Sequence, residues 1–537
     1  MIARAGTIRP AAPAALRFAL ALVACLALSE AAHAQAVDTW GSGETLAAPA
    51  AAPASPSPAP RAAPTCDCTV DAAASDLAPL RYTLQGVAVR GNTRTSTRVV
   101  LRYLPFEAGD VIDVSDPELE LARYRLLGTG YFRTVELSLE KGDRRGSVVL
   151  VVTVSERNTI VVNDVSMGLS ADADTGGEQR ALMAYGGVDV AETNLAGTGI
   201  TLGGGVAGAL DQFALRLRFL DPAFLGSPYM IAGTLLYTHA NDFFGNADVR
   251  WADPERDFQR TDFAVARYRR FGGSLGVGRD LSVSTQAFVH YRLETIDAHH
   301  PLAASHRRGF DYEPIDFDVA RGRSVLSSLR GVVQHDTRDH PFLPTRGWFA
   351  TLTGEFALLP AALDYDYQRI ELKAAHFTRL PFAGHVLELS MYGGAIAGHA
   401  PFFEQFYVGD FTDFLPDRLL GMNFDRRPPP NFLGTQIVEV RYGEYAAKLA
   451  FEYRIPLYRG RRSIYGIDFF WGGGVYGVAE GRSITAPPTG YSGLAQLPID
   501  VTANLGFRID TSAGGFVFAF ANALGFIPLR GQGPAGE

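Results

Sequence analysis

Few residues of this chain have the types and spacing that catalysis or metal binding needs. His299, His300 and His306 lie near Asp297, so they either converge on a metal ion or are scattered loop histidines. No Gly-x-Ser-x-Gly turn, phosphate-cradling glycine loop or cysteine pair with zinc spacing stands out in the sequence as a site. We therefore expect no enzymatic activity, no metal and no cofactor; a triad assembled across several strands stays an open alternative.

Apolar residues instead alternate with polar or charged residues in several segments of the C-terminal part of the chain. In 499–510 the odd positions are apolar, and the even positions are polar or glycine; 213–219 and 447–455 alternate in the same way. Such segments are strands with one face in lipid and the other toward a wet lumen. An Arg turned to the mid-bilayer costs roughly 2–4 kcal/mol, so the strict alternation favours a transmembrane antiparallel β-barrel over residues 159–530 rather than a soluble sandwich.

The last alternating segment is rich in large apolar residues on one face. These are Phe516, Phe518, Phe520, Leu524 and Phe526. On a soluble protein such an exposed strand is an aggregation hazard, whereas in a barrel wall it faces lipid. The segment resembles the final strand by which outer-membrane barrels are recognised for insertion, and residues 531–537 follow as a tail.

The first residues of the chain indicate export. Residues 1–34 combine early arginines, an apolar stretch and a small-residue cleavage site, which predicts a signal peptide; a lipoprotein signal with lipid on Cys25 is the alternative. Residues 35–80 are rich in Ala and Pro and predict a disordered linker. Cys66 and Cys68 in that linker are either oxidised to a disulfide or incidental thiols. The net charge of -8 argues against nucleic acid as a partner.

A small α+β domain is expected over residues 81–158. Its predicted elements follow the order β-α-α-β-β: a strand over 84–89, a helix over 96–104, a helix over 116–128, and strands over 134–139 and 147–155. Ser115 is the expected N-cap of the second helix, with Pro117 in the first turn. The chain of 537 residues thus divides into at least two structural units.

Short motifs in this domain resemble those of a POTRA domain, the periplasmic module of the BamA-type surface antigen superfamily. The residues that carry the resemblance are Gly91 and Asn92 after the first strand, Gly130, Tyr131 and Phe132 before the second, and Val154 to Glu156 at the end. We find one such domain. The resemblance implies a periplasmic location for it.

The barrel segment is similar to the same superfamily over nearly its whole length. The most specific match is a mid-barrel turn whose residues are Asp336, Arg338, Asp339, Pro344, Arg346 and Gly347. Asn194 to Gly199 and Phe451 to Pro456 also match. The family has about sixteen strands, whereas we count about fifteen, ending at Ile527. Either a strand is missed between Asn241 and Ser324 or the closing seam is unusual.

The segment from Gly398 to Glu444 matches the family's sixth extracellular loop, which folds into the lumen. In relatives the loop tip carries an Arg that pairs with an acidic residue of the wall; here the tip is Leu420-Gly421-Met422 and the wall position is Gly472. The absence of both partners is physically more reasonable than the absence of one, because a single buried charge without its partner destabilises the fold. We hypothesise that Arg418 reaches Asp468 or Glu452 instead; the alternative is that Arg418 is a loop-surface charge.

The resemblance implies a factor that inserts outer-membrane proteins or translocates polypeptides. Its expected partners are outer-membrane lipids, unfolded outer-membrane or secreted client polypeptides, and periplasmic chaperones or accessory lipoproteins. A client strand would pair with the sheet edge at Thr134–Leu139. The alternatives are a dedicated two-partner-type secretion pore and, less favoured, a passive porin or an outer-membrane enzyme. The expected location is the cell outer membrane.

Overall fold

The computed structural model describes residues 81–520, apart from short segments at 114–115, 174–176, 246–247, 254–255, 358–363, 413–414, 416 and 461–462. The predicted signal peptide, the linker, Cys25, Cys66, Cys68, Leu524, Phe526 and the tail lie outside the described residues. No helix among the described residues is long and apolar enough to cross a membrane.

The N-terminal domain is a four-stranded sheet with two helices. Its elements are β1 (Arg81–Arg90), α2 (Thr97–Arg102), β2 (Val111–Asp113), α3 (Pro117–Gly128), β3 (Phe132–Lys141) and β4 (Ser147–Glu156). The strand order is β2-β1-β4-β3, with β1 parallel to β4. The predicted order of elements is confirmed, with the three-residue strand β2 as an addition. The helix N-cap is Asp116, whose carboxylate accepts the Glu118 N–H at 2.9 Å; the expected N-cap Ser115 lies outside the described residues.

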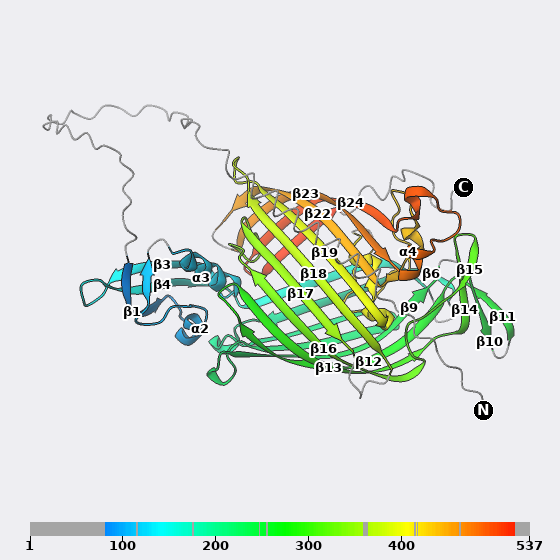
Figure 1. Ribbon diagram of the computed structural model, residues 1–537, viewed down its shortest axis with the longest axis horizontal. Helices are drawn as coiled ribbons and strands as arrows, with labels where there is room; N and C mark the ends of the chain where they lie inside the picture. The colour runs from blue at the N-terminus through cyan, green and yellow to red at the C-terminus, as the bar shows by residue number, and fades with distance from the viewer. Residues whose placement is uncertain are drawn as a thin grey trace. The chain divides into compact units, whose positions relative to one another are not determined.

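Fifteen antiparallel strands form the barrel sheet (Figure 1). In sheet order they are β5 (Ile160–Ala173), β6 (Gln179–Glu192), β7 (Thr201–Ala209), β8 (Gln212–Asp221), β9 (Tyr229–Phe244), β12 (Ala264–Asp280), β13 (Thr285–His299), β16 (Gly322–Asp336), β17 (Gly347–Phe356), β18 (Asp366–Arg379), β19 (Val386–His399), β22 (Tyr445–Arg459), β23 (Ile464–Ala479), β24 (Ile499–Thr511) and β25 (Gly514–Phe520).

Four shorter strands explain the difficulty of counting between Asn241 and Ser324. They are β10 (Val249–Asp253), β11 (Arg256–Thr261), β14 (Leu302–Arg308) and β15 (Asp311–Pro314), and they form a separate sheet. The long strands β12 and β13 of the same region belong to the barrel. Within the described residues the barrel therefore has fifteen strands, the number counted from the sequence.

Short elements complete the loops. These are β20 (Phe406–Tyr407), β21 (Tyr442–Gly443), α4 (Gly481–Thr485) and the 3-10 turns η1 (Leu195–Gly197), η2 (Phe224–Gly226), η3 (Phe402–Glu404), η4 (Val408–Asp410), η5 (Gln436–Glu439) and η6 (Gly493–Gln496).

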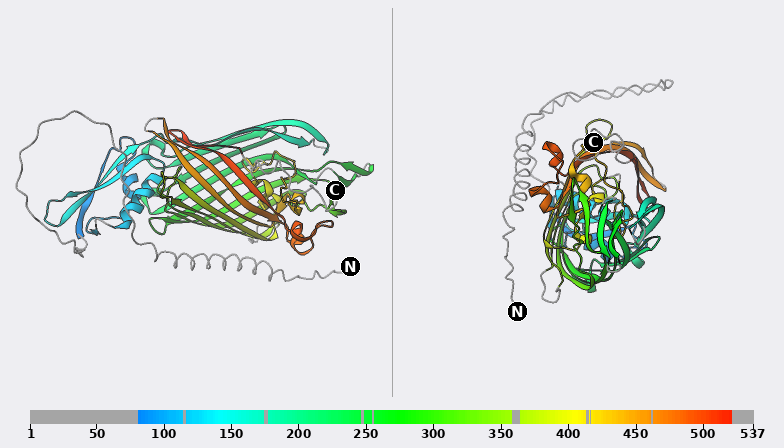
Figure 2. Two further views of the ribbon diagram at one scale, coloured as in Figure 1. Left: turned by 90° about the horizontal axis from the view of Figure 1, so that it is seen from above. Right: turned by 90° about the vertical axis from the view of Figure 1, so that its right-hand side faces the viewer.

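The predicted alternation of faces is confirmed along the barrel strands. In β22, Leu449 is 59% exposed on the outer face, whereas Arg454 is 1% exposed on the inner face. Leu505 and Phe507 of β24 are exposed in the same way, while Asp510 is buried. The right-hand view of Figure 2 shows the strands surrounding an interior. Charged and aromatic side chains are buried there. This interior positions the candidate site.

Candidate functional site

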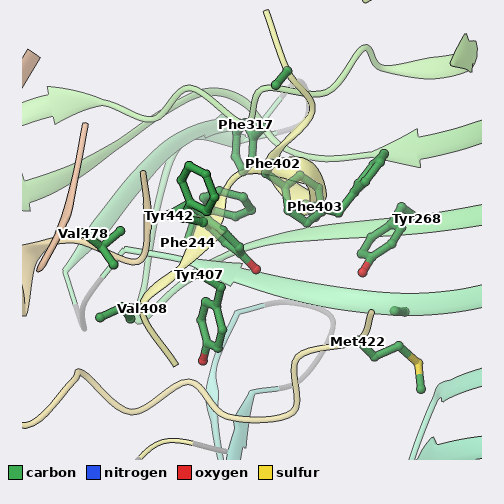
Figure 3. Close-up of a cluster of buried hydrophobic side chains, with 14 of the residues drawn as sticks. Phe244, Tyr268, Phe317, Phe402, Phe403, Tyr407, Val408, Met422, Tyr442 and Val478 are labelled. Carbon is green, nitrogen blue, oxygen red and sulfur yellow. The ribbon is translucent and has the colours of Figure 1, made fainter. Parts of the chain in front are cut away.

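The loop between β19 and β22, residues 400–444, enters the barrel; we call it the strap. Its aromatic side chains form the centre of the largest buried cluster, in contact with rings of the wall (Figure 3). Phe402 lies 5.4 Å from Phe244 of β9 and 5.2 Å from Tyr268 of β12, measured between ring centroids. Tyr407 and Tyr442 of the strap join the same cluster. The insertion of the loop implied by the family resemblance is therefore present here.

One carboxylate of the strap lies among arginines of the wall. Glu404 Oε1 is 2.6 Å from Arg292 Nη2 and 3.5 Å from Arg270 Nη2, and Glu404 Oε2 is 3.3 Å from Arg369 Nη1. These arginines come from β13, β12 and β18, and Glu404 is buried. The strap thus presents the acid and the wall the cation, which is the reverse of the pair implied by the family resemblance.

Further carboxylates balance the wall arginines. Arg292 also contacts Glu355 at 3.1 Å, and Arg270 contacts Glu294 at 2.7 Å. Glu355 accepts hydrogen bonds from Ser328 Oγ at 2.6 Å and from other neighbours. We call the set Arg270, Arg292, Glu294, Glu355, Arg369 and Glu404 the lumen ion-pair cluster. Removing one member of such a buried set leaves an uncompensated charge, which costs about 3–5 kcal/mol.

The hypothesis that Arg418 reaches Asp468 or Glu452 is wrong. Arg418 Nη2 lies 2.6 Å from Asp410 Oδ2, and the guanidinium also donates to the carbonyl oxygens of Phe403 and Gln405 at 2.9 and 3.1 Å. Its side chain is 14% exposed, so it is not a loop-surface charge either. The nearest carboxylate is the one only eight positions earlier in the same loop.

Both wall residues have other partners. Asp468 pairs with Arg459 of β22, and Glu452 receives two hydrogen bonds of 2.6 Å from Arg508 of β24. Gly472 lies in β23 opposite Glu452, and a Cβ there would meet the Phe451 carbonyl oxygen at 2.4 Å. The wall is therefore already satisfied without Arg418.

The tip of the strap is a two-residue turn against the early strands of the barrel. The Leu419 and Met422 backbones bond each other at 2.9 and 3.0 Å, with positive φ of 51° at Leu420 and 85° at Gly421. These are the angles of a type I′ hairpin turn, which explains Gly421. A Cβ at Gly205 of β7 would lie 3.2 Å from Leu420 Cδ2, so the missing side chain makes room for the tip.

The strap is bonded to strands on both sides of the barrel's closing edge. On one side, Ser170 Oγ of β5 donates to the Phe424 carbonyl oxygen at 2.6 Å. On the other side, Asp500 of β24 accepts the N–H groups of Phe432 and Leu433, both at 3.0 Å. The strap thus spans this edge from inside.

The closing edge itself, which we call the seam, lies between β5 and β25. Within the described residues no ladder joins these two strands; the Val162 N–H donates to the Ala513 carbonyl oxygen at 3.0 Å. By contrast, seven residue pairs join β24 and β25, and sixteen join β9 and β12. Because neighbours are antiparallel and fifteen strands are described, β5 and β25 run in the same direction. Phe516, Phe518 and Phe520 of β25 stand opposite Ile509, Phe507 and Leu505 of β24.

The mid-barrel turn has the predicted Arg–Asp pairing. Arg338 Nη2 lies 2.6 Å from Asp336 Oδ2, and Asp339 accepts the N–H groups of Thr345 and Arg346 at 2.7 and 3.1 Å. Gly347 has a positive φ of 102°, and a Cβ there would meet the Thr337 carbonyl oxygen at 2.3 Å.

The same turn extends beneath the seam strands, which the sequence did not indicate. The Pro344 carbonyl oxygen accepts a hydrogen bond of 2.7 Å from the buried Arg454 of β22. The Phe342 ring lies 4.7 Å from the guanidinium of Arg157, which in turn donates to the Thr511 carbonyl oxygen at 2.7 Å. The turn therefore links β16 and β17 to the far side of the barrel.

The motifs of the N-terminal domain are explained by backbone contacts. At Gly91 (φ +88°) a Cβ would meet the Val154 carbonyl oxygen at 2.1 Å. Asn92 Nδ2 donates to the Thr95 carbonyl oxygen at 3.0 Å. Gly130 also has positive φ, and it is followed by the buried Tyr131 and Phe132.

Glu156 at the end of the domain fastens the loop after β1. Its carboxylate accepts Thr93 Oγ1–H and the Thr95 N–H, both at 2.6 Å, and the Arg94 N–H at 3.0 Å. Burial by itself raises the pKa of this carboxyl, but these hydrogen bonds outweigh it and lower the pKa to about 2.

Sequence reasoning missed the lumen ion-pair cluster. Arg292 and Glu294 are two positions apart in the same strand, so their side chains lie on the same face. The alternation of apolar and polar residues could therefore have placed both on the inner face of the barrel. Nothing in the sequence indicated Glu404 as their partner. Among the described residues no group of three or more His, Cys, Asp and Glu is arranged to hold a metal ion; His300 stacks on Phe317 with 4.4 Å between ring centroids.

Comparisons with known proteins agree with this architecture. Residues 194–414 match the family model of the Omp85 superfamily domain, and residues 82–157 match the POTRA model, described as a surface antigen variable number repeat. Over 341 residues, 62% of this chain, the sequence is 25% identical to the outer membrane protein assembly factor BamA of Neorickettsia risticii. It is 24% identical over 346 residues, 60% of this chain, to the factor of the same name from Nitratidesulfovibrio vulgaris.

These alignments cover 39% and 36% of the two relatives, so the chain spans well under half of their length. Among solved structures, BamA from Haemophilus ducreyi lacking POTRA domains 1-3 aligns with a TM-score of 0.44 and 15% identity, over 82% of this chain and 80% of that chain.

Proposed function

Because the chain belongs to the BamA-type surface antigen superfamily, we propose that it inserts client β-strands into the outer membrane. The observation that carries the proposal is the seam. Within the described residues, no ladder joins β5 and β25, and one backbone hydrogen bond joins β5 to Ala513 in the turn before β25, whereas the other neighbouring strands form ladders. The facing edges therefore hold backbone donors and acceptors that a client strand can pair with. In lipid such groups must be satisfied, which favours pairing over exposure.

The strap acts as the clasp of this seam. Its bonds to Ser170 on one side and Asp500 on the other resist separation of the two edges. Entry of a client between the edges requires that one of these contacts yields. The lumen ion-pair cluster keeps the rest of the strap in place while this happens, because its charges are buried and mutually compensated.

The POTRA domain is the first binding site for a client in the periplasm. Strand β3 is an edge strand, so its outer backbone groups are open to an extended peptide, as predicted for Thr134–Leu139. A groove of about 980 Å³ beside it is lined by Leu119, Leu137 and Leu139. Periplasmic chaperones or accessory lipoproteins would deliver clients to this edge.

Site-specific photo-crosslinking in cells tests the proposal. A crosslinker at Val165 or Met167 of β5, both exposed beside the seam, is expected to capture nascent barrel proteins. The matched control is Leu352 of β17, which is exposed to lipid on a strand paired on both sides. Equal capture at the control position would refute insertion at the seam.

A census of the outer membrane after depletion separates the two polypeptide functions. Broad loss of barrel proteins is the result expected of an insertase. Loss of one exported protein, with the other barrels unchanged, would instead support the dedicated two-partner-type secretion pore. An unchanged census would contradict both.

A further inference from the structure

The outer face of β12 carries arginines at two heights. Arg267, Arg269 and Arg279 are exposed, and they share their face with the exposed Phe271, Leu275 and Val277. The intervening Tyr268 and Arg270 are buried toward the lumen. The outer face of β12 is therefore an apolar stretch with arginine at both ends.

The spacing matches the thickness of a membrane. Arg279 stands ten positions after Arg269. At about 3.3 Å per residue and a strand tilt of about 40°, this distance corresponds to about 25 Å across the bilayer, the height of the apolar band of outer-membrane barrels. Arg269 thus lies at one border of the hydrocarbon and Arg279 at the other.

The border at Arg269 is basic across neighbouring strands. Arg269 stands opposite Asp297 of β13, which stands opposite the exposed Arg323 of β16. Arg267, one step further from the apolar band, stands opposite His299. None of the three arginines forms an ion pair with another described residue; Asp297 lies 3.8 Å from His299 Nδ1. The rim at β18 differs from this basic border, because its carboxylate Asp366 pairs with His399 at 2.8 Å.

The chemistry of this patch fits phosphate. Arginine presents a rigid fork of N–H donors that matches phosphate oxygens, and it is weakly hydrated at an interface. Directly toward the membrane lie Phe271 and Tyr237, which stand opposite each other on β12 and β9 and fit acyl chains. Phosphate above and hydrocarbon below is the arrangement of a phosphorylated glycolipid.

We propose that Arg267, Arg269 and Arg323 form a binding site on the outside of the barrel for the phosphate groups of an outer-leaflet glycolipid. The assignment to the outer leaflet rests on the proposed function, with the POTRA domain in the periplasm, since Asp280 at the other end of β12 lies 2.8 Å from Arg102 of the POTRA domain. The site holds the barrel at a fixed depth on the face made by β12, β13 and β16.

The test uses the full chain in detergent and lipid A as the probe, with and without its phosphates. The unaltered protein is expected to bind the phosphorylated form roughly tenfold tighter or more, because each arginine near a charged lipid surface adds to binding. In Arg267→Gln/Arg269→Gln most of this preference disappears. The matched control Arg279→Gln, on the same face at the opposite border, keeps it.

Equal affinity of the unaltered protein for both lipids would overturn the site, as would an equal loss in Arg279→Gln. Should the double variant not fold, judged by its heat-dependent gel mobility, Arg323→Gln and the comparison of the two lipids still decide. No client is present in this measurement. A failure here therefore leaves the crosslinking result untouched, and a failure of client crosslinking leaves lipid binding untouched.

Discussion

Glu404 of the strap and Arg292 of β13 are 112 positions apart, and they are joined by a hydrogen bond of 2.6 Å inside the barrel. The pair anchors a loop that has no other carboxylate in the lumen ion-pair cluster. This pair therefore fixes the position of the strap inside the barrel.

Glu404→Gln is expected to loosen the strap. The amide removes one of the carboxylates that compensate Arg292 and its neighbours, and the excess buried positive charge costs about 3 kcal/mol. Hydrogen exchange of the amides in 402–411 should rise in the full chain. Asp366→Asn, which alters a largely exposed carboxylate at the rim, is the control and should leave exchange there unchanged. Identical exchange in the two variants would show that Glu404 does not anchor the strap.

Asp500→Ala is expected to weaken the clasp of the seam. Two partly buried strap N–H groups lose their acceptor. A fully buried unsatisfied donor costs about 1–3 kcal/mol, and we expect the lower end of this range here. Client capture by a crosslinker at Met167 should increase, because the edges separate more readily. Thr378→Ala, on an exposed hydroxyl of β18, serves as the control. A capture yield at Met167 that stays at the unaltered level would contradict the clasp.

The contact between the strap and the loop before β16 is expected to depend on pH. Gln405 Nε2 donates to Asp318 Oδ2 at 2.8 Å. Burial, followed by the charge of Asp316, raises the pKa of Asp318 to about 7 and outweighs the hydrogen bond from Gln405, which lowers this pKa; Glu444 and Glu480 also raise it. Between the ordinary pKa and about 7 the docked loop holds a proton that the released loop loses. The stability of the contact therefore falls as pH rises through this range and levels off above it.

Hydrogen exchange around Gln405, corrected for intrinsic rates, should be faster at about pH 8 than at about pH 5. Asp318→Asn should remove most of this difference while leaving the contact in place. A dependence that persists unchanged in Asp318→Asn would assign it to another group.

Glu156→Gln is expected to release the loop after β1 in the POTRA domain. The lowered pKa of Glu156 means that its ionised form stabilises the fold by up to about 3 kcal/mol at neutral pH. This stabilisation is present above the ordinary pKa of 4.5 and is lost as pH falls through about 2. Exchange of the Arg94 and Thr95 amides at neutral pH should rise in the variant.

Glu140→Gln is the control for Glu156, because Glu140 forms a surface pair with Arg90, and solvent screens such exposed pairs so that they contribute little to stability. If the Arg94 and Thr95 amides exchange alike in both variants, Glu156 does not fasten the loop.

Much of the barrel could be predicted because its rule is local. A strand between lipid and a wet interior must alternate, so Phe507 outward and Asp510 inward follow from their positions in the chain. The short strands β10, β11, β14 and β15 obscured the count, because their alternation indicates strands without indicating which sheet they join.

The path of the strap could not be predicted in the same way. Arg418 was expected at the wall because a family pair had been lost, yet Asp410 in the same loop was nearer once the loop folded. Glu404 offered no periodicity to indicate its direction. The alternation of β5 and β25 likewise did not indicate that no ladder joins their described residues; a weak seam between the first and last strands was implied by the family resemblance alone.

The sequence by itself determined which side chains face lipid and where the turns fall, because solvent contrast and backbone sterics act on each segment separately. Only the tertiary structure decided that Glu404 meets Arg292 and that the strap bridges β5 and β24. Contacts between distant segments depend on how the whole sheet closes, and closure depends on all fifteen described strands together.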